Sequence, residues 1–179
     1  MVLAALIIGI FAMVANVSAY QFKSRPNVIL CQLVGCLLFA LNMFMLGALM
    51  CGILNIVCIV RALDFLKKER IKLTIKLVNG IFMLVYIASY VLVFTVFGKE
   101  PSLKNLLLEI VPLIGTGAMT IGLSMNDARS IRVCGFINSP CWLIYNTLNY
   151  SLGGILCEVF GLVSIISAYI RYDVKNSKE

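Results

Sequence analysis

The sequence predicts an all-α membrane protein with seven transmembrane helices. Its 179 residues are 61% hydrophobic and only 13% charged, whereas about 25% of the residues of a soluble domain are charged. Seven apolar stretches alternate with short polar gaps, and each approaches the ~20 residues that cross the hydrocarbon core of a bilayer. The expected spans are Val2–Tyr20, Val28–Leu46, Ala48–Leu66, Leu77–Phe97, Leu106–Met125, Val133–Leu148 and Leu152–Ile170.

Positive charge falls into every second gap, and this alternation sets the orientation. One set of gaps holds most of the Lys and Arg residues: Lys23, Arg25, Arg61, Lys67, Lys68, Arg70, Lys72, Lys76, Arg129, Arg132, Arg171, Lys175 and Lys178. The other set holds only Lys99 and Lys104. Because positively charged short loops stay in the cytoplasm, we expect the N-terminus outside and the C-terminus inside. The net charge of +7 then reflects loops that face anionic lipid, and we expect no nucleic-acid partner.

The first span ends on small residues, Val17-Ser18-Ala19, as a signal peptide would. No Lys or Arg precedes it, however, and a signal peptide begins with a basic region. We therefore expect this span to remain in the protein as its first helix.

The lengths of the gaps divide the chain into three parts. Gly47 alone separates the second and third spans and Asn149–Ser151 the last two, which predicts tight hairpins on the outer side. The longest cytoplasmic gap, around Lys67–Lys76, follows the third span. The expected parts are a triple-helix bundle at 1–68, a linker helix with its loops at 69–105, and a second triple-helix bundle with a short cytoplasmic tail at 106–179.

The two triplets share an order of features, which indicates an internal repeat. Each has a basic gap, then an Asn near the outer end of a helix, then Gly-Ile-Leu after a tight turn, and last an Arg near the cytoplasmic end. These are Lys23/Arg25, Asn42, Gly52-Ile53-Leu54 and Arg61 in the first, and Arg129/Arg132, Asn146, Gly154-Ile155-Leu156 and Arg171 in the second. With one helix between them, both triplets run in the same direction, so the repeat is parallel, as in transporters of the SWEET type.

Several motifs resemble the YgjV-like bacterial inner-membrane proteins. They are Val111-Pro112-Leu113-Ile114-Gly115-Thr116, Cys141-Trp142-Leu143-Ile144-Tyr145-Asn146, Ser151-Leu152-Gly153-Gly154 and Ile170-Arg171, with Met45-Leu46-Gly47-Ala48 and Ile53-Leu54-Asn55 through Arg61 in the first half. The resemblance covers most of the chain and implies a multi-pass protein of the bacterial inner membrane. The three-one-three plan is also similar to SWEET and PQ-loop transporters, although no Pro-Gln pair closes the first or the fifth span.

Polar residues within the spans predict a solute site in the outer half of the membrane. Buried polar groups in lipid are costly, so those retained need partners or a function. At about 1.5 Å of rise per residue, Asn55 and Glu158 lie roughly 9–10 Å below the outer edge. Asn42, Trp142 and Asn146 lie on neighbouring helices. These five residues form the candidate substrate site, with Glu158 expected within reach of Asn55 or Asn42. The alternative is that the amides bridge helices and serve packing.

Two arginines and two prolines are candidates for gating. Arg61 and Arg171 lie near the cytoplasmic ends of their spans, where they either gate or extend to the interface, and Arg61 is placed to pair with Asp64 on one helix face. Pro112 and Pro140 lie within the fifth and sixth spans, where each either kinks a hinge or is accommodated by packing.

Enzyme, metal and cofactor chemistry find no support in the sequence. There is no His, no Gly-rich phosphate loop and no paired intramembrane Asp. The seven cysteines, all within apolar spans and in no CxxC pair, are expected to be small packing residues. We therefore expect no enzyme, no cofactor and no metal. The leading hypothesis is a transporter or facilitator of a small polar solute in the lipid bilayer; the alternative is a non-transporting membrane protein that binds a partner or lipid. The sequence specifies no oligomeric state.

Overall fold

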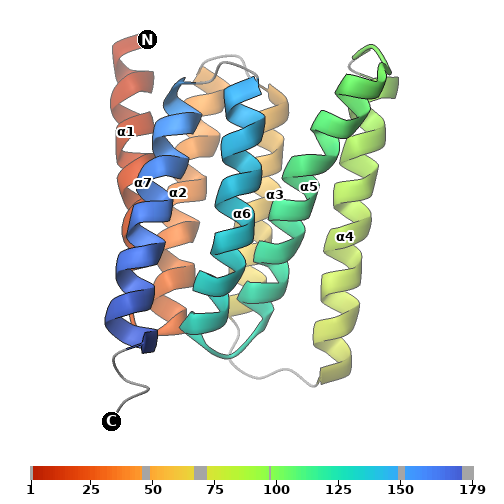
Figure 1. Ribbon diagram of the computed structural model, residues 1–179. Coiled ribbons are helices and arrows are strands. Elements are labelled where there is room, and N and C mark those ends of the chain that lie inside the picture. Colours follow the sequence, from red (N-terminus) through yellow and green to blue (C-terminus); the bar gives the residue numbers. More distant parts are fainter. Residues whose placement is uncertain (1, 46–48, 67–71, 97, 149–151, 175–179) are drawn as a thin grey trace. The chain divides into compact units, whose positions relative to one another are not determined.

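The computed structural model describes residues 2–45, 49–66, 72–96, 98–148 and 152–174, and these fold into helices without any strand. Figure 1 labels the seven α-helices in chain order: α1 (Val2–Ala19), α2 (Arg25–Met45), α3 (Leu49–Leu66), α4 (Lys72–Thr95), α5 (Leu103–Ser124), α6 (Ala128–Leu148) and α7 (Leu152–Tyr169). A π-helical turn at Ile170–Val174 continues α7. The expected all-α class with seven helices is confirmed for the described residues.

Four helices contain a segment long and apolar enough to cross a membrane. These segments are Arg25–Asn42, Thr74–Thr95, Leu103–Ser124 and Gly153–Val174. In α1 the apolar segment is the shorter Ile7–Ala19, and crossing by α1, α3 and α6 stays a prediction. Large apolar side chains point outward along α4, where Leu77 and Leu84 are 65% and 67% exposed. Such a surface suits contact with lipid, because a helix satisfies its own backbone groups.

Several helices begin earlier than the apolar spans that predicted them, whereas α1 and α7 begin where expected. α2 starts at Arg25 rather than Val28, α4 at Lys72 rather than Leu77, and α6 at Ala128 rather than Val133. Backbone hydrogen bonding continues past the point where apolar side chains give way to polar ones, so a helix extends beyond its hydrophobic segment. The two predicted tight turns, at Gly47 and Asn149–Ser151, lie outside the described residues.

Two compact units make up the chain. Unit 1 comprises Met1–Lys68, Asn126–Arg129 and Val163–Glu179, and unit 2 comprises Glu69–Met125 and Ser130–Leu162. The predicted boundaries at 1–68, 69–105 and 106–179 describe a different property, the repeat, and stay a prediction.

In unit 1, α1 packs against α2 and buries a row of small side chains. Ala5, Ala12 and Ala19 recur every seventh residue of α1 and are at most 1% exposed. A seven-residue spacing keeps one narrow face of a helix against its neighbour, and small residues let two helix backbones approach closely. At the end of α1, the side-chain amide of Gln21 donates to the carbonyl and hydroxyl oxygens of Ser164 at 2.8 and 2.9 Å.

In unit 2, α4 is hydrogen-bonded to α5 along its length. The Asn79 amide donates to the Ser124 hydroxyl at 3.0 Å, and the hydroxyls of Tyr86 and Thr120 lie 2.9 Å apart. The Tyr90 hydroxyl donates to the backbone carbonyl of α5 residue Leu106 at 3.3 Å. Figure 1 shows α4 and α5 side by side. The fourth helix is thus a partner of the fifth within this unit.

In the same unit, α5 approaches α6 at two glycines. A Cβ added at Gly122 would lie 2.7 Å from the Cys134 Cβ, and one added at Gly115 would lie 3.0 Å from the Cys141 Cβ. The two glycines are seven residues apart, so they share one face of α5. Together they form a seam in which an added methyl group would be tight at Gly115 and would force a shift at Gly122.

Candidate solute site on α5, α6 and α7

The loop between α4 and α5 positions one lysine. Gly98 adopts φ +65°, a left-handed conformation that glycine adopts without the steric cost of a Cβ. This ends α4 and turns the chain, and the Lys99 amide donates back to the Val93 carbonyl at 3.2 Å. Ser102 then caps α5 by accepting from the Asn105 amide. The loop therefore holds the Lys99 backbone between the ends of two helices.

An ion pair joins this loop to α5. The Lys99 Nζ lies 2.5 Å from Glu109 Oε1, and the two side chains are 28% and 10% exposed. Glu109 stands six residues after the first residue of α5, which is about 9 Å along the helix. The lysine of the pair is therefore partly accessible, whereas the carboxylate is mostly buried.

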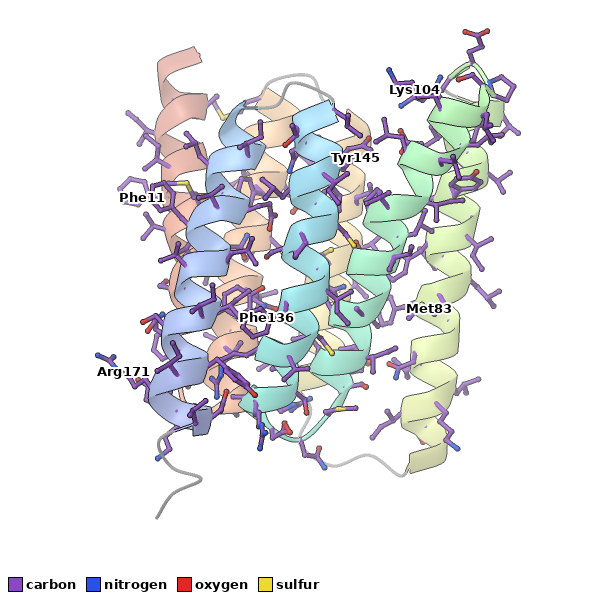
Figure 2. All side chains as sticks on the ribbon, in the orientation of Figure 1. Phe11, Met83, Lys104, Phe136, Tyr145 and Arg171 are labelled. Atoms are coloured by element: carbon purple, nitrogen blue, oxygen red, sulfur yellow. The ribbon has the colours of Figure 1, made fainter. Side chains whose placement is uncertain are left out.

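A tyrosine of α6 completes the surroundings of Glu109. The Tyr145 hydroxyl lies 3.3 and 3.4 Å from the two carboxylate oxygens and donates to them. Tyr145 is labelled in Figure 2, on α6. One carboxylate thus accepts from an ammonium on a loop and from a hydroxyl on a neighbouring helix.

Trp142, a predicted site residue, lies beside this cluster. Its ring meets the Tyr145 ring edge-on, with centroids 5.7 Å apart and planes at 81°. This is a favoured geometry for two aromatic rings. Trp142 therefore supports the ring whose hydroxyl reaches Glu109.

Glu158, the second predicted carboxyl, has its partner on α6. Its side chain hydrogen-bonds the Ser139 hydroxyl, and Ser139 is only 2% exposed. Glu158 also stands six residues after the first residue of its helix, α7. Its predicted partners Asn55 and Asn42 belong to unit 1, whereas Glu158 belongs to unit 2, so that contact stays a prediction.

Asn146 packs where α6 meets α7. Its side-chain atoms occupy the space that a Cβ added at Gly154 would need. A side chain at Gly154 would displace that amide from its present position. Nothing lies within 4 Å of a Cβ at Gly153.

The two amides of the first triplet lie in unit 1. The Asn42 amide donates to the Ala5 carbonyl at 2.5 Å and faces Gly9, so it joins α2 to α1. Asn55 is half-buried on α3. Asn42 and Asn146 do not make equivalent contacts, since Asn42 packs on the preceding helix and Asn146 on the following one.

The candidate gating residues differ in burial. Arg61 is 6% exposed on α3. Arg171 is exposed in the π-helical turn, where its guanidinium lies 5.9 Å from the centroid of the adjacent Tyr172 ring. Pro112 is buried one turn before the Gly115 contact with α6, and Pro140 is half-buried in α6. Pro112 therefore precedes a tightly packed segment.

Four polar residues of this arrangement were not predicted from the sequence: Lys99, Glu109, Ser139 and Tyr145. Lys99 was interpreted only as a marker of topology. Glu109 lies three residues inside the expected span Leu106–Met125 and six residues inside the observed apolar segment Leu103–Ser124. The available signal was an acidic residue inside an apolar run with the two outer lysines close to it in sequence.

A hollow lies at the beginning of α5. Lys104, Leu107, Leu108, Val111 and Leu148 line it, and it offers almost no polar group to a solute. Among the described residues, no three His, Cys, Asp or Glu side chains gather where a metal ion could bind.

A comparison with protein-family models matches residues 3–176 to the family Imp-YgjV, described as a bacterial inner membrane protein. No curated protein and no solved structure matches the chain.

Proposed function

Since the chain belongs to the Imp-YgjV family of bacterial inner membrane proteins, we propose that it transports, or facilitates the passage of, a small polar solute. The family and the apolar helices support an integral protein of the inner membrane. The transport role is our proposal.

The pairing of two carboxyl groups with α6 carries the proposal. Glu109 of α5 and Glu158 of α7 each lie about six residues inside a helix that is able to cross the membrane. Each meets a hydroxyl of α6, from Tyr145 and Ser139. Ionisable residues at such depth are costly in lipid and in membrane proteins mark solute and ion pathways. Helix packing alone does not require two carboxyl groups at this depth.

The repeat suggests how passage would occur. We expect residues 1–66 and 106–171 to be parallel triple-helix bundles, with the N-terminus outside and the C-terminus inside. Rocking of one bundle against the other would expose the site to each side in turn. Asn42 and Asn55 are expected to complete the site from the first bundle, with Pro112, Pro140, Arg61 and Arg171 at the moving parts.

The test is flux through vesicles that contain the purified protein. A panel of small polar solutes is first screened for protection against thermal unfolding, and solutes that protect are then followed into proteoliposomes. Glu158→Gln keeps size and hydrogen bonding but removes titration, so we expect it to reduce flux at least ten-fold while the protein stays folded. Glu100→Gln, in the exposed loop before α5, is the matched control and should transport normally.

Two results contradict the proposal. Flux that is unchanged in both Glu158→Gln and Glu158→Leu removes this carboxyl from the site. Vesicles that admit every solute of the panel no faster than protein-free vesicles contradict transport itself. That second result favours the alternative, a membrane protein that binds a partner or lipid.

A further inference from the structure

The two residues of the Lys99–Glu109 pair differ in burial and in how firmly they are held. Glu109 lies on a helix, is 10% exposed, and is held by the Tyr145 hydroxyl of a second helix. Lys99 lies on a loop, is 28% exposed, and reaches the carboxylate through a four-carbon stem. The carboxylate and the tyrosine are therefore a preformed acceptor, and the lysine is the part that can leave.

The Lys99–Glu109 ion pair is expected to add little to the stability of the protein. Taking two charges out of water costs about as much as their attraction returns, so a buried pair is often no more stable than apolar side chains. Removal of the cation alone costs more, because it leaves the charge of the mostly buried Glu109 carboxylate without a partner. The site at Glu109 thus requires a cation, but it does not require that this cation be Lys99.

The chemistry of the acceptor defines which cation fits. Glu109 offers carboxylate oxygens that already bind a primary ammonium, and Tyr145 offers a hydroxyl whose ring is supported by Trp142. A solute that presents the same group, R–NH₃⁺ on a short chain, reproduces the charge and the N–H donors of Lys99. A quaternary ammonium has the charge but no donor.

We propose that Glu109 and Tyr145 form a binding site for a small primary ammonium, which Lys99 occupies as a tethered substitute until the solute displaces it. This rests on the proposed function in that it names the solute class of the transporter. Trp142 acts as a positioning residue for Tyr145. Lys99 then keeps the empty site neutral, and its displacement frees a lysine on the loop before α5.

The experiment is chemical rescue of a variant that lacks the tethered ammonium. Lys99→Ala should lower the thermal unfolding midpoint of the full-length protein in detergent, and ethylammonium chloride should restore it. Sodium chloride at the same ionic strength should not, since screening alone supplies no donor. In the unmodified protein the tethered lysine competes with ethylammonium at an effective concentration in the millimolar range. The unmodified protein should therefore need an ethylammonium concentration about ten-fold higher than Lys99→Ala does for a comparable rise in its unfolding midpoint.

Control variants isolate the site. Lys104→Ala removes an exposed lysine of the same region and should gain no response to ethylammonium. Lys99→Ala combined with Glu109→Gln should lose the rescue, because the amide has no charge to satisfy. Tetramethylammonium should rescue Lys99→Ala less than ethylammonium does. If Lys99→Ala does not fold, Lys99→Met retains the apolar stem and tests the same point.

The outcomes separate this inference from transport. A folded Lys99 variant that responds identically to ethylammonium and sodium overturns the ammonium site, even if some other solute crosses the membrane. Rescue without any flux of ethylammonium into proteoliposomes supports the site and counts against transport. An equal response in Lys99→Ala and its Glu109→Gln double variant places the binding elsewhere and also overturns the inference.

Discussion

The seam between α5 and α6 predicts that a single methyl group will destabilise unit 2. A Cβ added at Gly122 would lie 2.7 Å from the Cys134 Cβ, 3.0 Å from its Sγ and 3.1 Å from the Ser130 carbonyl oxygen. Real Cβ atoms essentially never lie closer than 3.0 Å, and ordinary van der Waals contact begins at 3.4 Å. The nearest pair must therefore separate by 0.3 Å at the least, and by 0.7 Å to reach ordinary contact. A Cβ and a backbone carbonyl cannot rotate away, and the helices themselves must move.

Gly122→Ala should therefore cost about 1–3 kcal/mol, the usual penalty for overpacking a well-packed contact. The assay is reversible unfolding in mixed micelles by titration with sodium dodecyl sulfate, followed by circular dichroism. Gly80→Ala on α4 is the matched control, since nothing lies within 4 Å of its Cβ position. It should be neutral or stabilise by up to about 1 kcal/mol, because alanine forms helices better than glycine.

A compensating change tests the cause. Cys134→Gly removes the atom closest to the added methyl, so Gly122→Ala should cost less in that background than alone. A coupling free energy of this sign identifies the contact as the origin of the loss. Equal stability of the Gly122→Ala and Gly80→Ala variants would refute the reasoning, because it would mean that α5 and α6 do not meet at this seam.

Three further predictions concern single contacts and the orientation. Tyr86→Phe should cost about 1 kcal/mol through loss of the bond to Thr120, and the loss should shrink in a Thr120→Val background; equal losses in both backgrounds would contradict the contact. Asn42→Ala should cost about 1–2 kcal/mol in the same titration because it removes the bond between α2 and α1, and a neutral result would show that the amide does not bridge them. A cysteine placed at Lys104 should react with a membrane-impermeant maleimide in intact cells and one at Lys76 only after permeabilisation; the reverse pattern would invert the proposed topology.

The helices were predictable because length and hydropathy constrain them strongly. A segment that crosses hydrocarbon must bond its own backbone, so an apolar run of this length becomes a helix. The ends were less predictable. Apolar composition marks where lipid stops, and α4 continues to Lys72 because a helix tolerates lysine in its first turn when that turn lies in polar surroundings.

The candidate site was only partly predictable, for a geometric reason. Depth along a helix follows from sequence position, and this selected Trp142, Asn146 and Glu158. Which neighbouring helix a side chain meets depends on the rotation of each helix about its axis, and one sequence does not fix that rotation. Ser139 was therefore not foreseen as the partner of Glu158. The Lys99–Glu109 pair was missed because it depends on the turn at Gly98.

Trp142 is the chain's single tryptophan, and its position makes the protein its own optical reporter. It stands three residues after Ser139 and three before Tyr145, between the α6 contacts with the two carboxyls. Its ring touches that of Tyr145 at 5.7 Å between centroids. Indole emission from this protein therefore comes from one place only. A solute that displaces Lys99, or a change that separates Glu158 from Ser139, can be followed as a shift of that emission without any label.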